Sequence, residues 1–194
     1  MGHRKIQILC YADDAMLIVE NEDDLQRLLH RFVNTASTFN MITSTEKTQS
    51  MVISKEPIRC KLEVNNKIIQ QVMKFNYLGA IVSSNRNLVE EVRAQANRAN
   101  RIAGYLREVI WRNRNMSLRS KVRIYKTCIR PILTYAVETR ADITRTKRIL
   151  RTTEMRTLRA IRGVNLGDRM RSEQIRRECK IQDIVRWTRT RRRR

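Results

Sequence analysis

Two adjacent aspartates, Asp13 and Asp14, stand between two short apolar runs near the start of the chain. Carboxylates held side by side repel each other unless a cation neutralises them. Mg²⁺ and Mn²⁺ prefer carboxylate oxygens and share their remaining positions with waters and substrate phosphates. The pair therefore predicts a divalent-cation site for in-line displacement at phosphorus, in which a hydroxyl attacks and pyrophosphate leaves. The alternative is a solvated turn, because aspartate is common in turns.

The flanking pattern predicts how the pair is positioned. "IQILC" (6–10) and "AMLIV" (15–19) are separated by four residues, which is typical of a tight β-hairpin with the aspartates at its turn. From Glu22 the apolar residues follow helical spacing, and Asn21 is the expected N-cap. The expected order is therefore hairpin, then amphipathic helix.

Four strand-like segments follow the predicted helix. They are 50–54, 60–64, 67–72 and 75–82. Asn65 and Asn66 predict a hairpin turn between the second and third, and Gly79 predicts a bend or a close approach within the fourth.

Beyond about residue 86 the pattern becomes helical. A first helix carries an apolar seam with small residues at its middle, from Val89 to Ile110. A second begins after Ser117, runs to Ala136 and should be kinked by Pro131. A third covers 143–163 and ends at Gly163. Residues 164–194 predict one or two short basic helices, and the closing "RTRRRR" is expected to be frayed.

Charge divides the chain at nearly the same place. The chain carries 41 Lys and Arg against 19 Asp and Glu, a net charge of +22. Residues 1–85 hold 10 basic and 9 acidic side chains, whereas 86–194 hold 31 and 10. Because acids are too few to pair with these bases, the second part predicts contact with a polyanion such as nucleic acid, rather than a merely solvated helix face.

Taken in order, these motifs resemble one family. Tyr-Ala-Asp-Asp (11–14) between apolar strands resembles the catalytic hairpin of the reverse transcriptase palm. The helix from Glu22, "TEKTQSMVIS" (45–54), "FNYLG" (75–79) and the basic helices follow in that family's order. The chain is most similar to enzymes of non-LTR (LINE-type) retrotransposons, particularly those of insects, and the similarity extends over nearly its whole length.

The resemblance implies a role for each matching residue. Asp13 and Asp14 would be two members of a carboxylate trio that binds Mg²⁺ or Mn²⁺. Lys47 would protonate the leaving pyrophosphate, unless it is only an exposed lysine at a strand edge. Tyr11 and Ala12 would line the minor-groove side of the primer end or the turn beneath it. The primer-grip segment would consist of Phe75, Tyr77, Leu78 and Gly79. Tyr77 and Leu78 could instead simply pack the palm.

The implied fold class is α+β. Residues 1–82 would be the C-terminal part of a palm, built of antiparallel hairpins and one helix and carrying the catalytic hairpin and primer-grip segment. Residues 83–163 would form an all-helical basic thumb, and 164–194 a basic extension.

The resemblance also implies parts that these residues do not supply. In the family the third carboxylate and the fingers precede the catalytic hairpin, and no acid precedes Asp13 here. We therefore expect an inactive fragment of an RNA-directed DNA polymerase, whose status as an enzyme is uncertain. Ile8, and Leu17 or Val19, would be exposed beside a free sheet edge, where the missing fingers and palm portion could dock.

The expected partners are an RNA template, a DNA primer and their hybrid. Arg93, Asn97 and Arg101 recur every fourth residue and could follow phosphates without reading bases. The alternative functions are a non-enzymatic nucleic-acid-binding module derived from the thumb, or the product of a decaying element with no role. No apolar run predicts a membrane span, and four dispersed cysteines favour reduced thiols in a nuclear or cytoplasmic protein.

Overall fold

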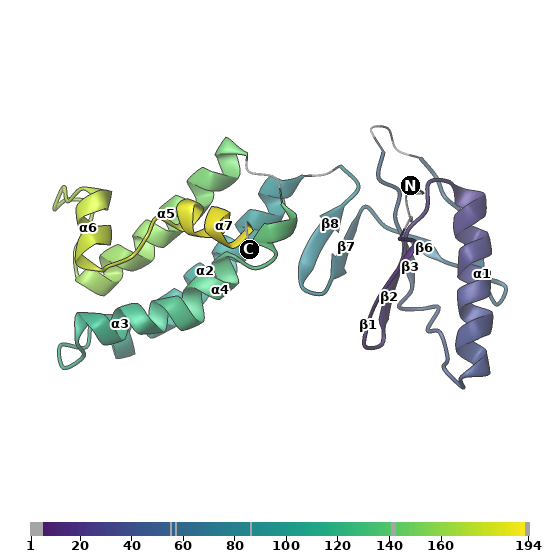
Figure 1. Ribbon diagram of the computed structural model, residues 1–194, viewed down its shortest axis with the longest axis horizontal. Coiled ribbons are helices and arrows are strands. Elements are labelled where there is room, and N and C mark those ends of the chain that lie inside the picture. Colours follow the sequence, from purple (N-terminus) through teal and green to yellow (C-terminus); the bar gives the residue numbers. More distant parts are fainter. Residues whose placement is uncertain (1–5, 55, 57, 86, 141–142, 193–194) are drawn as a thin grey trace. The chain divides into compact units, whose positions relative to one another are not determined.

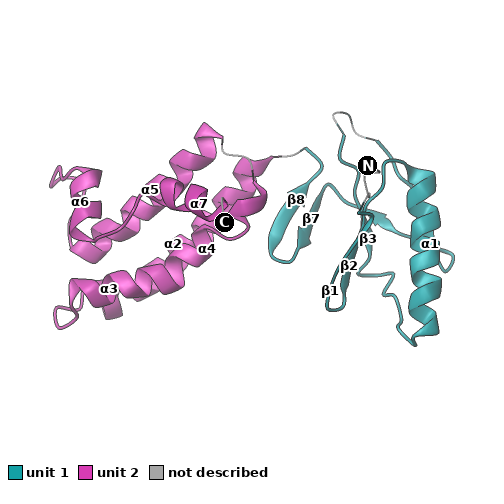
Figure 2. Cartoon of the chain, viewed as in Figure 1, with its two compact units in different colours: residues 1–86 teal, residues 87–194 magenta. Residues whose placement is uncertain are grey.

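The computed structural model describes residues 6–54, 56, 58–85, 87–140 and 143–192. The chain forms two compact units, residues 1–86 and 87–194, shown in different colours in Figure 2. Strands occur in the first unit, while the described part of the second is helical (Figure 1). The predicted α+β class is confirmed.

Strands β1 (Ile8–Tyr11) and β2 (Asp14–Leu17) form the predicted hairpin. They pair antiparallel with Tyr11 opposite Asp14, and the Ile18 amide extends the ladder by donating to the Gln7 carbonyl at 2.8 Å. The tight connection requires a left-handed backbone at Ala12, whose φ is 47°. A non-glycine residue rarely adopts this conformation, and strain of this kind is often found at functional turns.

Helix α1 (Glu22–Thr38) begins where the sequence predicted. The Asn21 side chain accepts a hydrogen bond from the Asp24 amide at 2.8 Å, which satisfies one of the free amides of the first turn. The buried face of α1 packs on the segment 60–69. The core of this unit consists of Leu29, Val33, Cys60, Leu62, Val64 and Ile69.

The middle strands are much shorter than predicted. They are β3 (Gln49–Ser50), β4 (Glu63–Val64), β5 (Lys67–Ile68) and β6 (Gln70–Gln71). Residues 51–54 and 60–62 lie outside strands, and at Cys60 and Lys61 side chains take the place of ladder bonds. Gln71, for example, accepts from the Cys60 amide at 3.0 Å and donates to the Ile58 carbonyl at 2.7 Å. The predicted turn at Asn65 and Asn66 is confirmed, with φ of 50° and 59°.

The prediction of one strand over 75–82 is wrong. The segment folds into a hairpin of its own, β7 (Lys74–Tyr77) with β8 (Ala80–Ser83), in which Tyr77 pairs with Ala80. Leu78 and Gly79 both have positive φ, 49° and 79°. Two successive left-handed residues reverse the chain, so Gly79 completes a turn rather than bending a strand.

The second unit begins with α2 (Leu88–Leu106), which continues through a π-helical turn, η1 (Arg107–Trp111). Its predicted small-residue seam is confirmed at its centre, where Ala96 and Ala99 are buried. Helix α2 packs against α5 (Thr144–Arg162) and α4 (Arg130–Leu133). Small side chains permit this close approach.

The second predicted helix is broken. Ser117 caps α3 (Leu118–Ile124), accepting from the Ser120 amide at 3.1 Å as expected. A π-helical turn, η2 (Tyr125–Ile129), then precedes α4, because Pro131 lacks the amide that would continue the regular ladder. The helix ends at Leu133 and not at Ala136, which has a φ of 52°. A short 3-10 turn, η3 (Val137–Thr139), follows.

The C-terminal helices close the core of this unit. Gly163, with a φ of 76°, ends α5 as predicted, and the Val164 amide donates to the Arg159 carbonyl at 3.0 Å. Two short helices follow, α6 (Ser172–Glu178) and α7 (Ile184–Arg192). The expectation that 189–194 frays is wrong for 189–192, because Arg192 donates to the Val137 carbonyl at 2.9 Å. The last two arginines lie outside the described residues.

Candidate functional site

The paired aspartates lie at the tip of the β1–β2 hairpin. Asp13 belongs to the turn, and Asp14 is the first residue of β2. Both side chains are exposed, and Tyr11 beside them is 66% exposed. The tip therefore presents carboxylate oxygens and an aromatic ring to solvent, where a cation or a polynucleotide can reach them.

The donors at the tip fit a hard divalent cation. Carboxylate oxygens are the ligands that Mg²⁺ and Mn²⁺ prefer, and an exposed turn leaves room for waters and phosphates. Among the described residues no group of three His, Cys, Asp or Glu side chains gathers in a way that could hold a metal ion. Within that part of the chain, Asp13 and Asp14 are thus a pair of candidate ligands and not a trio.

The β7–β8 hairpin is connected to the hairpin that carries the aspartates. The Tyr77 hydroxyl donates to the Leu9 carbonyl across 3.4 Å. Phe75 and Tyr77 lie on the same side of β7, and their rings are stacked with centroids 6.4 Å apart. The sequence placed both residues in one functional segment but offered no signal for the contact of Tyr77 with β1.

The other predicted residues of this segment lie at its turn. Leu78 is 37% exposed and Gly79 is exposed, whereas Phe75 and Tyr77 are half-buried. Phe75 and Tyr77 are thus partly packed into the unit, whereas Leu78 and Gly79 lie at its surface.

Lys47 lies apart from these contacts. It is exposed in the turn at 45–47 that precedes β3, and its ammonium forms no ion pair with the described acidic residues. In that part of the chain, therefore, no ion pair links Lys47 to Asp13 or Asp14. Its proposed proton transfer stays a prediction.

The β1–β2 hairpin also exposes apolar surface. Ile8 is 40% exposed, as expected, and Leu9 and Ile18 are 41% and 44% exposed. Leu17 packs against the core beneath α1 and is half-buried, and Val19 is half-buried too, so the expectation that one of these two would be exposed is not met.

The second unit exposes basic side chains on two long helices. Arg93, Asn97 and Arg101 are all exposed on α2, as their spacing predicted. Helix α5 adds a row that the sequence analysis missed, with Arg145, Arg148 and Arg156 exposed at steps of three and eight residues. The signal was present, since these steps keep residues on one face of a helix.

Other arginines stabilise the fold instead. Glu154 on α5 is fully buried and accepts from the Tyr125 hydroxyl at 3.2 Å, Arg176 Nε at 3.1 Å and the Ile184 amide at 3.3 Å. Burial raises the pKa of Glu154, while Arg176 lowers it. Arg176 also contacts Asp183 at 3.1 Å. These contacts attach α6 and α7 to α5, so the basic content of this unit overstates the charge free to bind a ligand.

No helix in the described part of the chain is long and apolar enough to cross a membrane.

Comparison with known proteins confirms the resemblance to reverse transcriptases of non-LTR elements. Residues 2–82 match the family described as "Reverse transcriptase (RNA-dependent DNA polymerase)". A curated relative, the RNA-directed DNA polymerase from mobile element jockey of Drosophila funebris, is 24% identical over 171 residues. That alignment covers 84% of this chain but only 19% of the relative, so the chain spans about a fifth of the relative's length. No solved structure matches.

Proposed function

We propose that this chain is part of an RNA-directed DNA polymerase of a non-LTR retrotransposon, and that its first unit carries two of the metal-binding carboxylates of the active site. The observation that carries the proposal is the position of Asp13 and Asp14 at the exposed tip of a β-hairpin inside the segment that matches the reverse transcriptase family. A solvated turn would account for two aspartates, but not for this match.

The proposed roles follow from the positions of the side chains. Asp13 and Asp14 would hold Mg²⁺ or Mn²⁺, which supplies charge neutralisation at the attacking hydroxyl and the leaving pyrophosphate. Tyr11 would contact the primer end from the same tip, and Ala12 would shape the turn. The turn at Leu78 and Gly79 would hold the primer backbone, with Tyr77 fixing its hairpin against β1. Lys47 would donate a proton to pyrophosphate.

Two carboxylates hold a metal less firmly than three, so we expect the 194-residue chain alone not to extend a primer. In the complete polymerase a further carboxylate and the template-binding region would come from other parts of the protein. The RNA template and DNA primer would be shared between those parts and the basic second unit.

A chimera tests the catalytic assignment. The chain replaces the aligned 171-residue region of the jockey polymerase, and primer extension is measured on an RNA template with Mg²⁺. We expect incorporation by the chimera. Asp13→Asn and Asp14→Asn should each lower the incorporation rate at least about a hundredfold, since each removes a negative charge that binds the metal. Asp23→Asn, an exposed aspartate in the first turn of α1, is the matched control. Equal activity in the hairpin variants would refute the assignment, and incorporation by the 194-residue chain alone would refute its proposed inactivity.

The second unit favours a further candidate function, a nucleic-acid-binding module that acts without catalysis. Its support is the row of exposed cations on α2 and α5, in a region where basic side chains outnumber acids three to one. The two candidates differ in their dependence on Asp13 and Asp14, because a binding module would retain affinity for an RNA–DNA hybrid when both are replaced.

A further inference from the structure

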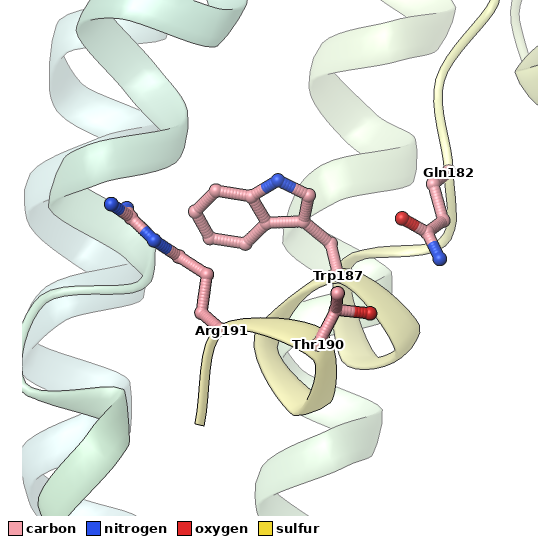
Figure 3. A pocket seen from close by; sticks show the side chains of 4 residues that line it. All are labelled: Gln182, Trp187, Thr190 and Arg191. Atoms are coloured by element: carbon pink, nitrogen blue, oxygen red, sulfur yellow. The ribbon is translucent and has the colours of Figure 1, made fainter. Parts of the chain in front are cut away.

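A pocket of about 440 Å³ opens on α7 of the second unit, away from any residue assigned above. It is lined by Gln182, Trp187, Thr190 and Arg191 (Figure 3). In the figure the indole lies in the middle, with the Arg191 guanidinium on one side and Gln182 and Thr190 on the other. Aromatic, amide, hydroxyl and guanidinium groups therefore meet in one small space.

A buried cation lies against Trp187, one of the residues that line this pocket. Arg130 is 93% buried, and its guanidinium carbon lies 5.3 Å from the centroid of the Tyr125 ring and 5.1 Å from that of the Trp187 ring. Its Nε and Nη2 make no hydrogen bond to any residue that the structure describes. Buried donors without acceptors are costly, and the ring faces compensate only in part. The indole of Trp187 is thus held against a positive charge that no described carboxylate neutralises by an ion pair.

The polar groups of the pocket are available to a ligand. Arg191 is exposed, and its guanidinium lies 5.1 Å from the Trp187 ring centroid with no ion pair to a described acid. The Gln182 amide is exposed and makes no hydrogen bond to the described residues. The Thr190 hydroxyl donates to the Arg186 carbonyl at 3.1 Å and can still accept a bond.

We propose that this pocket binds one nucleotide of a single-stranded nucleic acid, with its base stacked on Trp187 and its phosphate beside Arg191. Every base offers a π face, and stacking on an aromatic ring with a nearby cation is the usual means of holding an unpaired nucleotide. An exposed cation–π contact is weaker than base–indole stacking, so a base can displace the Arg191 guanidinium, which then turns to the phosphate. Gln182 is placed to hydrogen-bond to a base edge.

The pocket would give the second unit a contact that a duplex cannot make, because paired bases do not offer their faces. The inference rests on the proposed contact of this unit with nucleic acid. It adds that unpaired template next to the hybrid would be held at α7, separately from the cations of α2.

Tryptophan emission provides a direct measurement. Trp111 is 3% exposed and its indole donates to the Ala103 carbonyl at 2.8 Å, so it should not respond to a ligand. The probe is an eight-residue oligouridylate, added to the wild-type chain and to Trp187→Phe. The difference between the two signals isolates Trp187. We expect this signal to be quenched by oligouridylate and unchanged by a blunt duplex of the same length at equal phosphate concentration.

Variants then connect the signal to affinity. Trp187→Leu should weaken oligouridylate binding about tenfold and Trp187→Phe about threefold or less, since phenylalanine still stacks. Arg191→Gln and Gln182→Ala change exposed groups and should each weaken binding without changing the unfolding midpoint. Arg114→Gln, an exposed arginine in the loop before α3, removes the same charge and should have a smaller effect than Arg191→Gln.

The outcomes separate this inference from the proposed function. If oligouridylate affinity is the same in Arg191→Gln, Gln182→Ala and Arg114→Gln, or if inorganic phosphate quenches Trp187 as strongly as oligouridylate, the nucleotide pocket is refuted. Binding of an RNA–DNA hybrid that persists in those variants would still support the proposed function. If the wild-type chain binds no nucleic acid at all, both the nucleotide pocket and the proposed contact of the second unit with nucleic acid are refuted.

Discussion

The hydroxyl of Tyr77 lies 3.4 Å from the carbonyl oxygen of Leu9 and joins the β7–β8 hairpin to the strand that leads to Asp13 and Asp14. Residues 68 positions apart in the sequence are thereby held together within one unit. In the proposed polymerase this bond would fix the primer-holding turn relative to the metal-binding carboxylates.

Removal of that hydroxyl should loosen the two hairpins without unfolding the unit. At 3.4 Å the bond is long, so we expect Tyr77→Phe to cost about 0.5 kcal/mol. Amide hydrogen exchange in β1 and β7 should quicken roughly twofold, as such a change implies. Tyr105→Phe, which alters a 75% exposed tyrosine of the second unit, is the control. Unchanged exchange in β1 would show that the bond does not join the hairpins in solution.

The turn between β4 and β5 should tolerate only residues that accept a left-handed backbone. Asn66 has a φ of 59°, where a β-branched side chain clashes with its own backbone. Asn66→Val should destabilise the first unit by about 1–2 kcal/mol, and Asn66→Gly should be neutral or slightly stabilising. Exchange of amides in 60–72 measures the difference. Equal protection in the two variants would contradict the turn geometry.

The buried carboxylate of Glu154 should be the most sensitive single position of the second unit. Glu154→Ala leaves the Tyr125 hydroxyl and the Ile184 amide without their acceptor, and removes one of the two carboxylates that contact Arg176. We expect a loss of about 3–5 kcal/mol. Both tryptophans belong to this unit, so fluorescence-detected urea unfolding reports on it alone. Glu173→Ala, at an exposed position on α6, should cost less than about 0.5 kcal/mol.

The ion pair of Glu91 and Arg140 should make stability depend on pH. Both side chains are buried and their closest charged atoms are 4.0 Å apart. Burial raises the pKa of Glu91, and Arg140 only partly opposes this. The folded state therefore holds this proton more tightly than the unfolded state does. The stability that this bound proton contributes is fully present at pH values below the ordinary glutamate pKa. It is lost as the pH rises through the raised pKa of Glu91.

Glu91→Gln should abolish this part of the pH dependence. Relative to wild type, the variant should become more stable as pH rises from about 4 through the raised pKa. Urea unfolding monitored by tryptophan fluorescence at several pH values measures it, with exposed Glu173→Gln as the control. A constant difference between variant and wild type over this range would mean that Glu91 has no raised pKa.

Binding of an RNA–DNA hybrid should depend on salt and on the exposed arginines of α2. Each phosphate contact adds about 0.7–0.9 to the slope of log affinity against log salt concentration. Arg93→Gln/Arg101→Gln should weaken binding and lower the slope by about 1–2. Arg114→Gln/Arg169→Gln removes two exposed charges elsewhere and is the matched control. Affinity that does not change between about 50 and 200 mM salt would exclude the electrostatic mode.

Local signals in the sequence determined much of this protein. Helix caps at Asn21 and Ser117, the stop at Gly163 and the turn at Asn65 and Asn66 all arise from interactions within a few residues, and all were predicted correctly. The Tyr-Ala-Asp-Asp hairpin belongs to the same class, because alternating apolar strands and a short connection suffice to place Asp13 and Asp14 at a turn.

Tertiary structure decided what depends on distant partners. The bond from Tyr77 to Leu9 joins residues 68 positions apart, a contact that sequence spacing does not encode. Equally, the sequence does not show which arginines are free to bind a ligand. In the folded chain Arg176 is paired with buried Glu154, and Arg130 is buried against the rings of Tyr125 and Trp187. A charge binds a ligand only where the fold leaves it exposed or unpaired, and that is a property of packing in three dimensions.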